Sequence, residues 1–469
     1  MVLVVSGIIL LVISNATDQK TIISCFIISL PVVLAYIRYF VNFLSSSFFF
    51  IVFYIMLFYA QPIVYFITGE EYSYDFSSIK TLVIITVLGI HFFILGNLVF
   101  NTKKLISINV EIPQRQINQA INFSILITLL CIMLLFVDAK TFNVLNLGRL
   151  DLKNAGSLLR ITATFGLYLT SVLFFLVYFT AKKRSRFNII LWTIFVIVLE
   201  IIIFLFYRTR SLLVVHLASC LVGYYYSYAY FSSEIKIKTK KGKALLFGVI
   251  IVCIAIFTRF FRGYLQPGSD ISTFEINWKS FLQKSVEDGD LGYSSTVLKV
   301  INLVPNTYDY LNGQSYWKLL LTPIPRSIWS EKPLNTETIV GGWLFPEIRG
   351  MSVPPGIIGD LYLNFGVYGV LLMIVFGIGF SLLDRKVTFK GFLIWAVSST
   401  WIFHLVRGGF TNPIMIFFIQ YYFINFIIKR YFLGVIIHNS SQKLLRGRLK
   451  GVSTLRLEAD SQINKMGGT

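Results

Sequence analysis

Charged residues are scarce in this chain of 469 residues, since only 14% are Asp, Glu, Lys or Arg. Soluble domains average about 25% charged residues, which excludes an ordinary soluble domain. Acidic residues are scarcer than basic ones, with 22 Asp and Glu against 42 Lys and Arg, and the formal net charge is +20. In a soluble protein this balance would indicate a nucleic-acid partner. In a chain this apolar, basic cytoplasmic segments and anionic membrane lipids account for it, so no nucleic acid is expected.

Cysteines and known chemical motifs are also few. The four cysteines all fall within apolar segments, which argues against a disulfide framework or a zinc site. No Gly-rich phosphate loop, zinc-ligand spacing or nucleophile elbow occurs. The aspartate pair expected of a metal-dependent nucleotide-sugar transferase is likewise missing, so we expect neither a cofactor nor a metal. The N-terminus lacks a positive region and a cleavage site, and we interpret it as a first span.

Long hydrophobic runs dominate what is present, with 56% hydrophobic residues and 44 phenylalanines. About 20 apolar residues are needed to cross a bilayer as a helix. The sequence therefore predicts an all-α polytopic membrane protein with about twelve transmembrane helices. The predicted spans are 1–15, 21–37, 46–67, 80–100, 119–137, 159–180, 188–207, 211–230, 244–258, 356–380, 390–406 and 411–429.

The distribution of basic residues orients these spans. With both termini in the cytoplasm, the inner segments include the lysine-rich runs around 103–104, 182–184 and 236–243 and the basic tail. The opposite orientation would place those clusters across the membrane, against the positive-inside rule. The long segment 259–355 is then extracytoplasmic.

That long segment is the one extended polar stretch between the spans. Pro323, Pro325 and Pro333 exclude a regular helix or central strand at its centre. Its many aromatic residues argue against a disordered linker, so we expect a folded lid over a site. The predicted organisation is nine transmembrane helices in 1–258, an extracytoplasmic loop in 259–355, three more helices in 356–429, and a basic cytoplasmic tail in 430–469.

Arginines gather at the outer helix ends, where the positive-inside rule disfavours them. The planar guanidinium can bind phosphate oxygens through two parallel hydrogen bonds. Any single one could be a snorkelling arginine, but for the set we predict a shared anionic ligand. Helix N-termini of the outward-to-inward spans add positive dipole ends on the same side, which suits a diphosphate. The assigned arginines are Arg208, Arg210, Arg259, Arg262, Arg326, Arg349 and Arg407.

Candidate catalytic residues lie close to these arginines in the sequence. His404 is three residues before Arg407 and shares its helix face; an imidazole could accept a proton from a sugar hydroxyl. The alternative is a buried, hydrogen-bonded histidine. Asp360, with Asn364 one helical turn later, is a second candidate base or a clamp for sugar hydroxyls.

Other polar and aromatic residues are candidates for sugar contacts or for structural roles. Trp317 and Trp329 could stack on sugar faces, and Asn364 could bind a sugar hydroxyl. Glu200 lies deep in a span, where a transport or packing role competes with a catalytic one. His91 and His216 are isolated in the sequence, and we favour structural roles for both.

A proline–arginine–tryptophan–lysine–proline run occupies 323–333, and a loop-to-span junction occupies 354–369. Both stretches resemble the Wzy-type O-antigen and capsule repeat-unit polymerases. About twelve spans with one large late outer loop also resemble that family. The resemblance implies a glycosyltransferase of polysaccharide biosynthesis (lipopolysaccharide or capsule) in the bacterial cytoplasmic membrane, with its active site on the extracytoplasmic face.

In such enzymes a growing glycan on polyprenyl diphosphate is transferred to the terminal sugar of another lipid-linked repeat unit. The implied partners are this lipid-linked oligosaccharide, membrane lipids and a chain-length regulator protein. Two alternatives stay open at this point. An O-antigen ligase would use the same donor, and a lipid-linked oligosaccharide flippase would have a similar number of spans but repeated halves, which the sequence does not show.

Overall fold

A computed structural model describes most of the chain, and every structural statement below concerns its described residues. These are 1–42, 45–100, 114–141, 158–180, 185–207, 211–231, 286, 292–321, 329, 333–348, 351–384 and 389–432.

The described part of the chain is helical and contains no strand, as the sequence predicts. In chain order the helices are α1 (Val2–Asn15), α2 (Gln19–Phe40), α3 (Ser46–Phe58), α4 (Ala60–Thr68), α5 (Phe76–Phe100), α6 (Gln114–Thr141), α7 (Leu158–Phe179), α8 (Arg186–Tyr207), α9 (Ser211–Phe231), α12 (Tyr293–Leu303), α13 (Gln314–Leu321), α14 (Thr336–Leu344), α15 (Gly356–Phe365), the 3₁₀ segment η4 (Gly366–Leu371), α16 (Leu372–Asp384), α17 (Phe389–Gly408), α18 (Thr411–Ile427) and the π-helical turn η5 (Ile428–Phe432).

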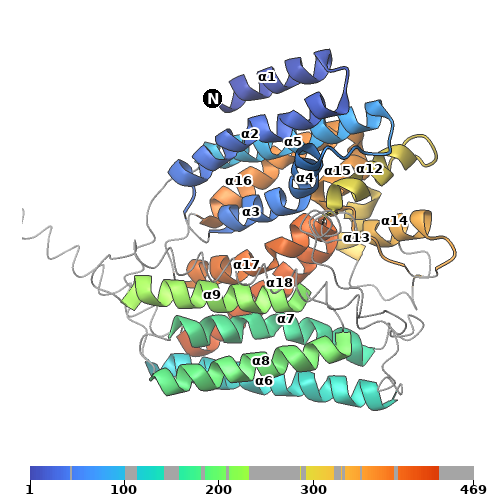
Figure 1. Ribbon diagram of the computed structural model, residues 1–469. Helices are drawn as coiled ribbons and strands as arrows, with labels where there is room; N and C mark the ends of the chain where they lie inside the picture. Colours follow the sequence, from blue (N-terminus) through green and yellow to red (C-terminus); the bar gives the residue numbers. More distant parts are fainter. Residues whose placement is uncertain are drawn as a thin grey trace, which may run out of the picture.

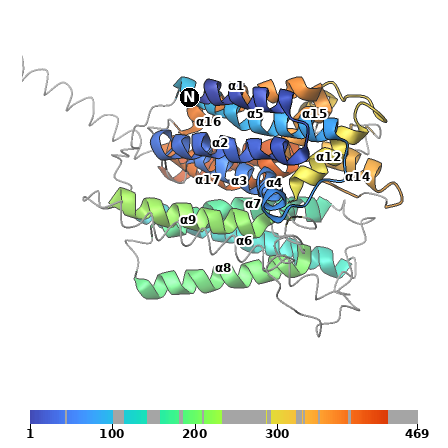
Figure 2. The ribbon, with the colours of Figure 1, turned by 45° about the horizontal axis from the view of Figure 1, so that its top comes forward.

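The long helices lie side by side and roughly parallel to one common axis (Figures 1 and 2). One group contains α1, α2, α3, α5 and α16, and a second contains α6, α7, α8 and α9. Helix α17 joins the two groups because it packs on α3 as well as on α7 and α9. The short helices α12, α13 and α14 gather at one end of the bundle (Figure 1).

Four described stretches are long and apolar enough to cross a membrane: Gln19–Phe40, Phe76–Phe100, Arg115–Leu134 and Gly356–Asp384. The pair α3 and α4, bent by 40° between Phe58 and Ala60, makes a fifth if it is one interrupted span. All five overlap spans expected from the sequence. The expected span 244–258 lies outside the described residues, so the total of about twelve stays a prediction. The described part of 259–355 contains α12, α13 and α14, and its extracytoplasmic location also stays a prediction.

Helices α5 and α16 approach each other closely through two glycines. A Cβ added at Gly96 would lie 2.0 Å from the carbonyl oxygen of Ile374, and one at Gly377 would lie 2.1 Å from that of Phe93. Each helix therefore presses its backbone against the other at a residue without a side chain. Small residues have this role in membrane helix packing, where lipid provides no hydrophobic driving force for association.

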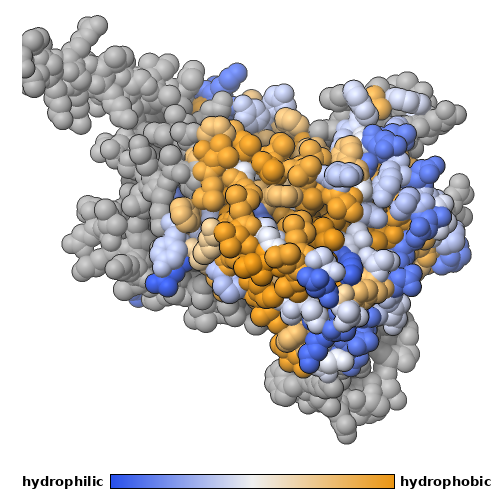
Figure 3. All heavy atoms as spheres, turned by 90° about the horizontal axis from the view of Figure 1, so that it is seen from above, coloured by the Kyte–Doolittle hydropathy of each residue, from blue (hydrophilic) through white to orange (hydrophobic). Residues whose placement is uncertain are grey.

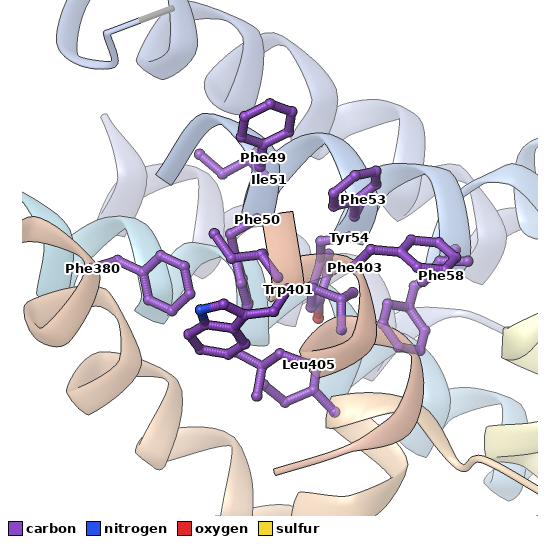
Figure 4. Packing of buried hydrophobic residues seen from close by; sticks show 14 of the residues in the cluster. Phe49, Phe50, Ile51, Phe53, Tyr54, Phe58, Phe380, Trp401, Phe403 and Leu405 are labelled. Carbon is purple, nitrogen blue, oxygen red and sulfur yellow. The ribbon is translucent and has the colours of Figure 1, made fainter. Parts of the chain in front are cut away.

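Large aromatic side chains fill the space around this contact. Figure 4 shows Phe50 of α3 between neighbouring helices, and its ring centroid is 4.1 Å from that of Phe93 and 5.1 Å from that of Phe380. Phe53 packs in the same way on Phe403 of α17, with centroids 5.2 Å apart. These contacts attach α17, which ends at the candidate site, to the first helix group.

A polar cluster joins the N-terminal end of α3 to the C-terminal parts of α5 and α16. The Asp384 carboxylate accepts hydrogen bonds from the backbone N–H groups of Ser46 (2.9 Å) and Ser47 (3.1 Å) at the start of α3. Asn97 donates to the Ser47 hydroxyl (2.8 Å) and to the carbonyl of Gly377 (3.1 Å). The first N–H groups of a helix have no partner within the helix, and a carboxylate there also suits the helix dipole.

The outer surface of this group is strongly apolar. Figure 3 shows hydrophobic side chains covering the face formed by α1 and α2, while hydrophilic side chains collect at the end where α12 and α14 lie. Exposed members include Leu3, Val4, Leu11 and Leu34. An apolar surface of this extent, with a polar end, is the pattern expected of helices in contact with lipid.

The glycine contact generates a stability prediction. Gly96→Ala and Gly377→Ala should each cost about 1–3 kcal/mol, because the new methyl group would overlap a backbone carbonyl that cannot move independently of its helix. The apparent melting temperature of the detergent-solubilised protein should therefore fall. Gly379→Ala is the matched control on α16, since nothing lies within 4 Å of its added Cβ. Equal melting temperatures for all three variants would contradict this packing.

Candidate functional site at one end of the helix bundle

The break between α3 and α4 is a docking point for the start of α12. The hydroxyl of Ser294 donates to the carbonyl oxygen of Phe58 (2.8 Å). Gln61, fully buried in α4, makes two hydrogen bonds to Ser295: its Oε1 accepts from the backbone N–H (3.0 Å), and its Nε2 donates to the hydroxyl (2.6 Å). A buried backbone group without a partner costs about 1–3 kcal/mol, and these contacts supply partners at the bend.

A second docking point lies at the end of α15, before the 3₁₀ segment. The N–H of Leu311 donates to the carbonyl of Leu363 (2.9 Å), and the hydroxyl of Tyr362 donates to the carbonyl of Val304 (3.1 Å). Helix α15 therefore holds the connection between α12 and α13 against the bundle. Hydrogen bonds therefore join α12 to the α3–α4 break, and join the connection between α12 and α13 to the end of α15.

The turn between α17 and α18 meets these elements. Gly409 has φ +91°, in the left-handed region that favours glycine, and its Cβ position lies 3.0 Å from the Cγ of Asp360. The N–H of Phe410 approaches Asp360 Oδ2 at 3.4 Å. On the other side, a Cβ at Gly408 would lie 2.6 Å from Glu337 Oε1 of α14. Two consecutive glycines thus let two carboxylates reach the turn.

Asp360 is fully buried against this turn. Its Oδ1 has no hydrogen-bond partner of ordinary geometry among the described residues, although the hydroxyl groups of Thr336 and Tyr316 lie beside the carboxyl. Burial, reinforced by the nearby Asp360 carboxyl, raises the pKa of the Tyr316 phenol far above its usual range. The Tyr316 hydroxyl lies beside the carboxyl without a hydrogen bond of ordinary geometry to any described residue.

Arg407 occupies the last turn of α17, immediately before the two glycines. Its Nε donates a hydrogen bond of 2.6 Å to the hydroxyl of Tyr293, the first residue of α12. Tyr293 is buried and packs edge-on to Phe58, with ring centroids 6.4 Å apart. Arg407 is the one predicted diphosphate ligand within the described residues. Its side chain is held by α12, the helix that docks on the α3–α4 break.

His404 lies one turn earlier on α17 and is partly exposed. Its ring packs edge-on to Tyr168 of α7, with centroids 5.7 Å apart. Gln420 of α18 donates to the carbonyl of Tyr168 (3.2 Å) and to the hydroxyl of Ser171 (2.9 Å). His404 thus lies where α7 meets α17 and α18, close along the helix to Arg407.

The remaining predicted site residues divide into two groups. Asn364 is fully buried, and its amide is engaged: Oδ1 accepts from Ser315 (2.9 Å) and Nδ2 donates to the carbonyl of Asp360 (2.8 Å). Trp317 and Trp329 are exposed, by 65% and 38%, and so are accessible for stacking. The arginines that lie outside the described residues are Arg208, Arg210, Arg259, Arg262, Arg326 and Arg349.

Two arrangements were not foreseen from the sequence. His216, isolated in the sequence and assigned a structural role, is buried with its Nδ1 on the Glu200 carboxylate and its Nε2 hydrogen-bonded to the Thr170 hydroxyl (2.6 Å), and these partners were not predicted. The depth of Glu200 in a span was the available signal, because a buried carboxylate requires a partner. Nothing in the sequence indicated that Tyr293 would meet Arg407. Within the described ranges, no three His, Cys, Asp or Glu residues come together as a metal site.

The comparisons with known proteins identify the family. The chain matches the family described as O-antigen polysaccharide polymerase Wzy over residues 1–438. The chain belongs to this polymerase family. The searches of curated proteins and of solved structures each returned no match. The match confirms the resemblance expected from the two short stretches, extends it to nearly the whole chain, and makes this a membrane protein of polysaccharide biosynthesis.

The burial of Asp360 generates a prediction that separates two roles in this polymerase. If its carboxyl supports the 408–410 turn, Asp360→Asn should keep polymer synthesis within about tenfold, because an amide oxygen can still accept from Phe410. A general base contributes about 10²–10⁴ in rate, so loss of that role would abolish long polymer. Polymer length on gels from complemented cells, at matched protein level, distinguishes these outcomes. A well-expressed but inactive Asp360→Asn variant would favour the general base.

Proposed function

We propose that this protein transfers a growing glycan from polyprenyl diphosphate to the terminal sugar of another lipid-linked repeat unit, on the outer face of a bacterial cytoplasmic membrane. The family match supports the polymerase activity. The observation that carries the finer proposal is the position of Arg407. It lies at the polar end of the bundle, beside the α17–α18 turn and the docked start of α12.

In the proposed reaction, a hydroxyl oxygen of the acceptor sugar attacks the anomeric carbon of the donor glycan. A new glycosidic C–O bond forms as the bond to the diphosphate oxygen breaks, and the acceptor proton passes to a base. Negative charge grows on the leaving diphosphate, and guanidinium groups can stabilise it without a metal. Arg407 is the proposed ligand within the described residues. The arginines at 208, 210, 259, 262, 326 and 349 are proposed to complete the set.

His404 is the proposed base and Asp360 the alternative. His404 lies on α17 one helical turn from Arg407, close to the position proposed for the diphosphate, and this proximity supports its assignment as the base. The Asp360 carboxyl is fully buried under Gly409 and Phe410, which favours a supporting role. Asn364 is proposed to contribute indirectly through α13, and the exposed Trp317 and Trp329 to contact sugar.

Arg407 variants test the diphosphate assignment. Arg407→Ala should reduce polymerisation by roughly 10²–10³, judged by the loss of one oxyanion donor in other enzymes. Arg407→Lys should also be impaired, since a single ammonium does not reproduce the planar fork. The measurement is polymer yield in complemented cells, normalised to membrane protein. Full-length polymer at normal yield from both variants would contradict the assignment.

A deletion strain distinguishes the polymerase from the two alternatives. If the product is an O-antigen, loss of a polymerase should leave lipid A core bearing a single repeat unit, because translocation and ligation continue. His404→Ala should give the same product if His404 is the base. His91→Ala should not, because His91 is buried against Ser6 at the α1–α5 contact. Long polymer retained on the carrier lipid would indicate a ligase, and single units facing the cytoplasm a flippase.

The proposed orientation places the α12–α14 end outside the cytoplasm. In a background with its native cysteines replaced, Glu347→Cys should react with a membrane-impermeant thiol reagent in intact spheroplasts, because Glu347 is exposed beside α14. Ser185→Cys, exposed before α8, should react only after lysis. The reverse pattern of labelling would overturn the orientation.

A further inference from the structure

We infer that Glu200 and His216 form a buried pair that shares one proton and anchors helix α8 in the bundle. The pair joins two helices, since Glu200 lies in α8 and His216 in α9. It gives a carboxylate deep in a predicted span a role that is neither catalysis nor transport. Neither residue takes part in the proposed reaction, so the anchor exists whether or not that reaction is the right one.

The hydrogen bonds around His216 place a proton on its Nε2. The Thr170 hydroxyl donates to the carbonyl of Leu167 at 2.7 Å, so its oxygen remains as an acceptor. His216 Nε2 faces both that hydroxyl oxygen (2.6 Å) and the Leu167 carbonyl oxygen (3.0 Å). A carbonyl can only accept, so Nε2 is the donor. This arrangement excludes Thr170 as a nucleophile activated by the imidazole, because the nitrogen that faces it has no lone pair to take a proton.

The other ring nitrogen of His216, Nδ1, contacts the Oε1 of Glu200. A hydrogen bond between these atoms needs one proton, on the carboxyl or on the imidazole, and either position leaves the pair without net charge. His216 is 0% exposed and Glu200 is 8% exposed. An ionised group buried to this extent is costly unless it is paired. One shared proton is therefore the state that burial favours.

Among its described side chains, α8 buries only three: Val196, Leu199 and Glu200. Helix α8 lies at the outer edge of the second helix group in Figure 2. A further hydrogen bond joins the Thr193 and Tyr178 hydroxyls (2.8 Å) at an exposed position. The large hydrophobic side chains that α8 exposes are Phe187, Ile190, Leu191, Ile194, Ile197, Val198 and Ile201.

This distribution makes the polar pair the principal anchor of α8. Lipid tails are as apolar as the helix surface, so no hydrophobic force drives α8 against its neighbours, and association depends on close packing and interhelical hydrogen bonds. Two buried aliphatic side chains, Val196 and Leu199, provide limited packing. The Glu200–His216 contact is buried, and His216 is itself held on α7 through Thr170 and Leu167. The pair thus connects α8 through α9 to α7.

Paired removal tests the anchor by the apparent melting temperature of the purified full-length protein in detergent. Glu200→Leu and His216→Leu should each lower this temperature, because each leaves the other polar group buried without its partner. The double variant should melt above both single variants, since it removes both polar groups together. Ser219→Ala is the matched control on α9: its buried hydroxyl donates to the carbonyl of Val215 in the same helix (2.8 Å), and the variant should melt as the wild type does.

Cross-linking measures the docking of α8 directly. In a background with its native cysteines replaced, Thr193→Cys and Tyr178→Cys should be joined by a short bifunctional thiol reagent, because the two native hydroxyls are 2.8 Å apart. Adding Glu200→Leu should reduce the yield of this cross-link. Glu200→Gln should keep it, because an amide N–H can donate to the Nδ1 of an imidazole that carries its proton on Nε2.

Three results would overturn the anchor. The first is a pair of single-variant losses that add in the double variant, since the two residues would then act independently. The second is an unchanged cross-link in Glu200→Leu or, if that variant does not fold, a lost cross-link in Glu200→Gln. The third is loss of polymer synthesis in Glu200→Gln with a normal cross-link, which would assign the carboxyl to proton transfer instead.

Discussion

The requirement that every buried backbone polar group have a partner shapes this structure. A backbone N–H or carbonyl that is buried without a partner costs about 1–3 kcal/mol. Two helical stretches are nevertheless interrupted, between α3 and α4 and between α15 and α16. Both interruptions receive partners from the segment over 292–321: Ser294 of α12 donates to the Phe58 carbonyl, and Leu311, in the connection between α12 and α13, donates to the Leu363 carbonyl. The interruptions are therefore the points at which α12 and α13 attach.

This attachment explains why polar residues distant in the sequence meet at one end. Once α12 is fixed on the α3–α4 break, its first residue, Tyr293, reaches Arg407 at the end of α17. Once α15 is bonded to the connection between α12 and α13, Asp360 reaches the Gly409–Phe410 turn. The glycines at 356 and 409 allow these backbones to come together. Arg407 is then held from α12, while the turn after it is held from α15.

Composition and charge predicted the helical class, and five of the predicted spans overlap described apolar stretches. Hydropathy is sufficient there because apolar length alone decides whether a helix can cross a bilayer. The same measure did not predict the bend after Phe58, which depends on partners in α12. Nor did it pair His216 with Glu200, since that contact depends on how α8 and α9 pack. Asp360 and Arg407 were both predicted as site residues, and their roles stay predictions. The structure brings both to the α17–α18 turn. The burial of Asp360 was not predicted, because it depends on the packing of Gly409 in that turn.

The central claim is that the guanidinium of Arg407 binds the diphosphate of the carrier lipid. The most direct measurement is an experimental structure of the full-length protein in lipid nanodiscs with a non-transferable polyprenyl diphosphate analogue. We predict diphosphate density within hydrogen-bond distance of the Arg407 guanidinium. Diphosphate density elsewhere, with Arg407 making no contact to it, would contradict the account.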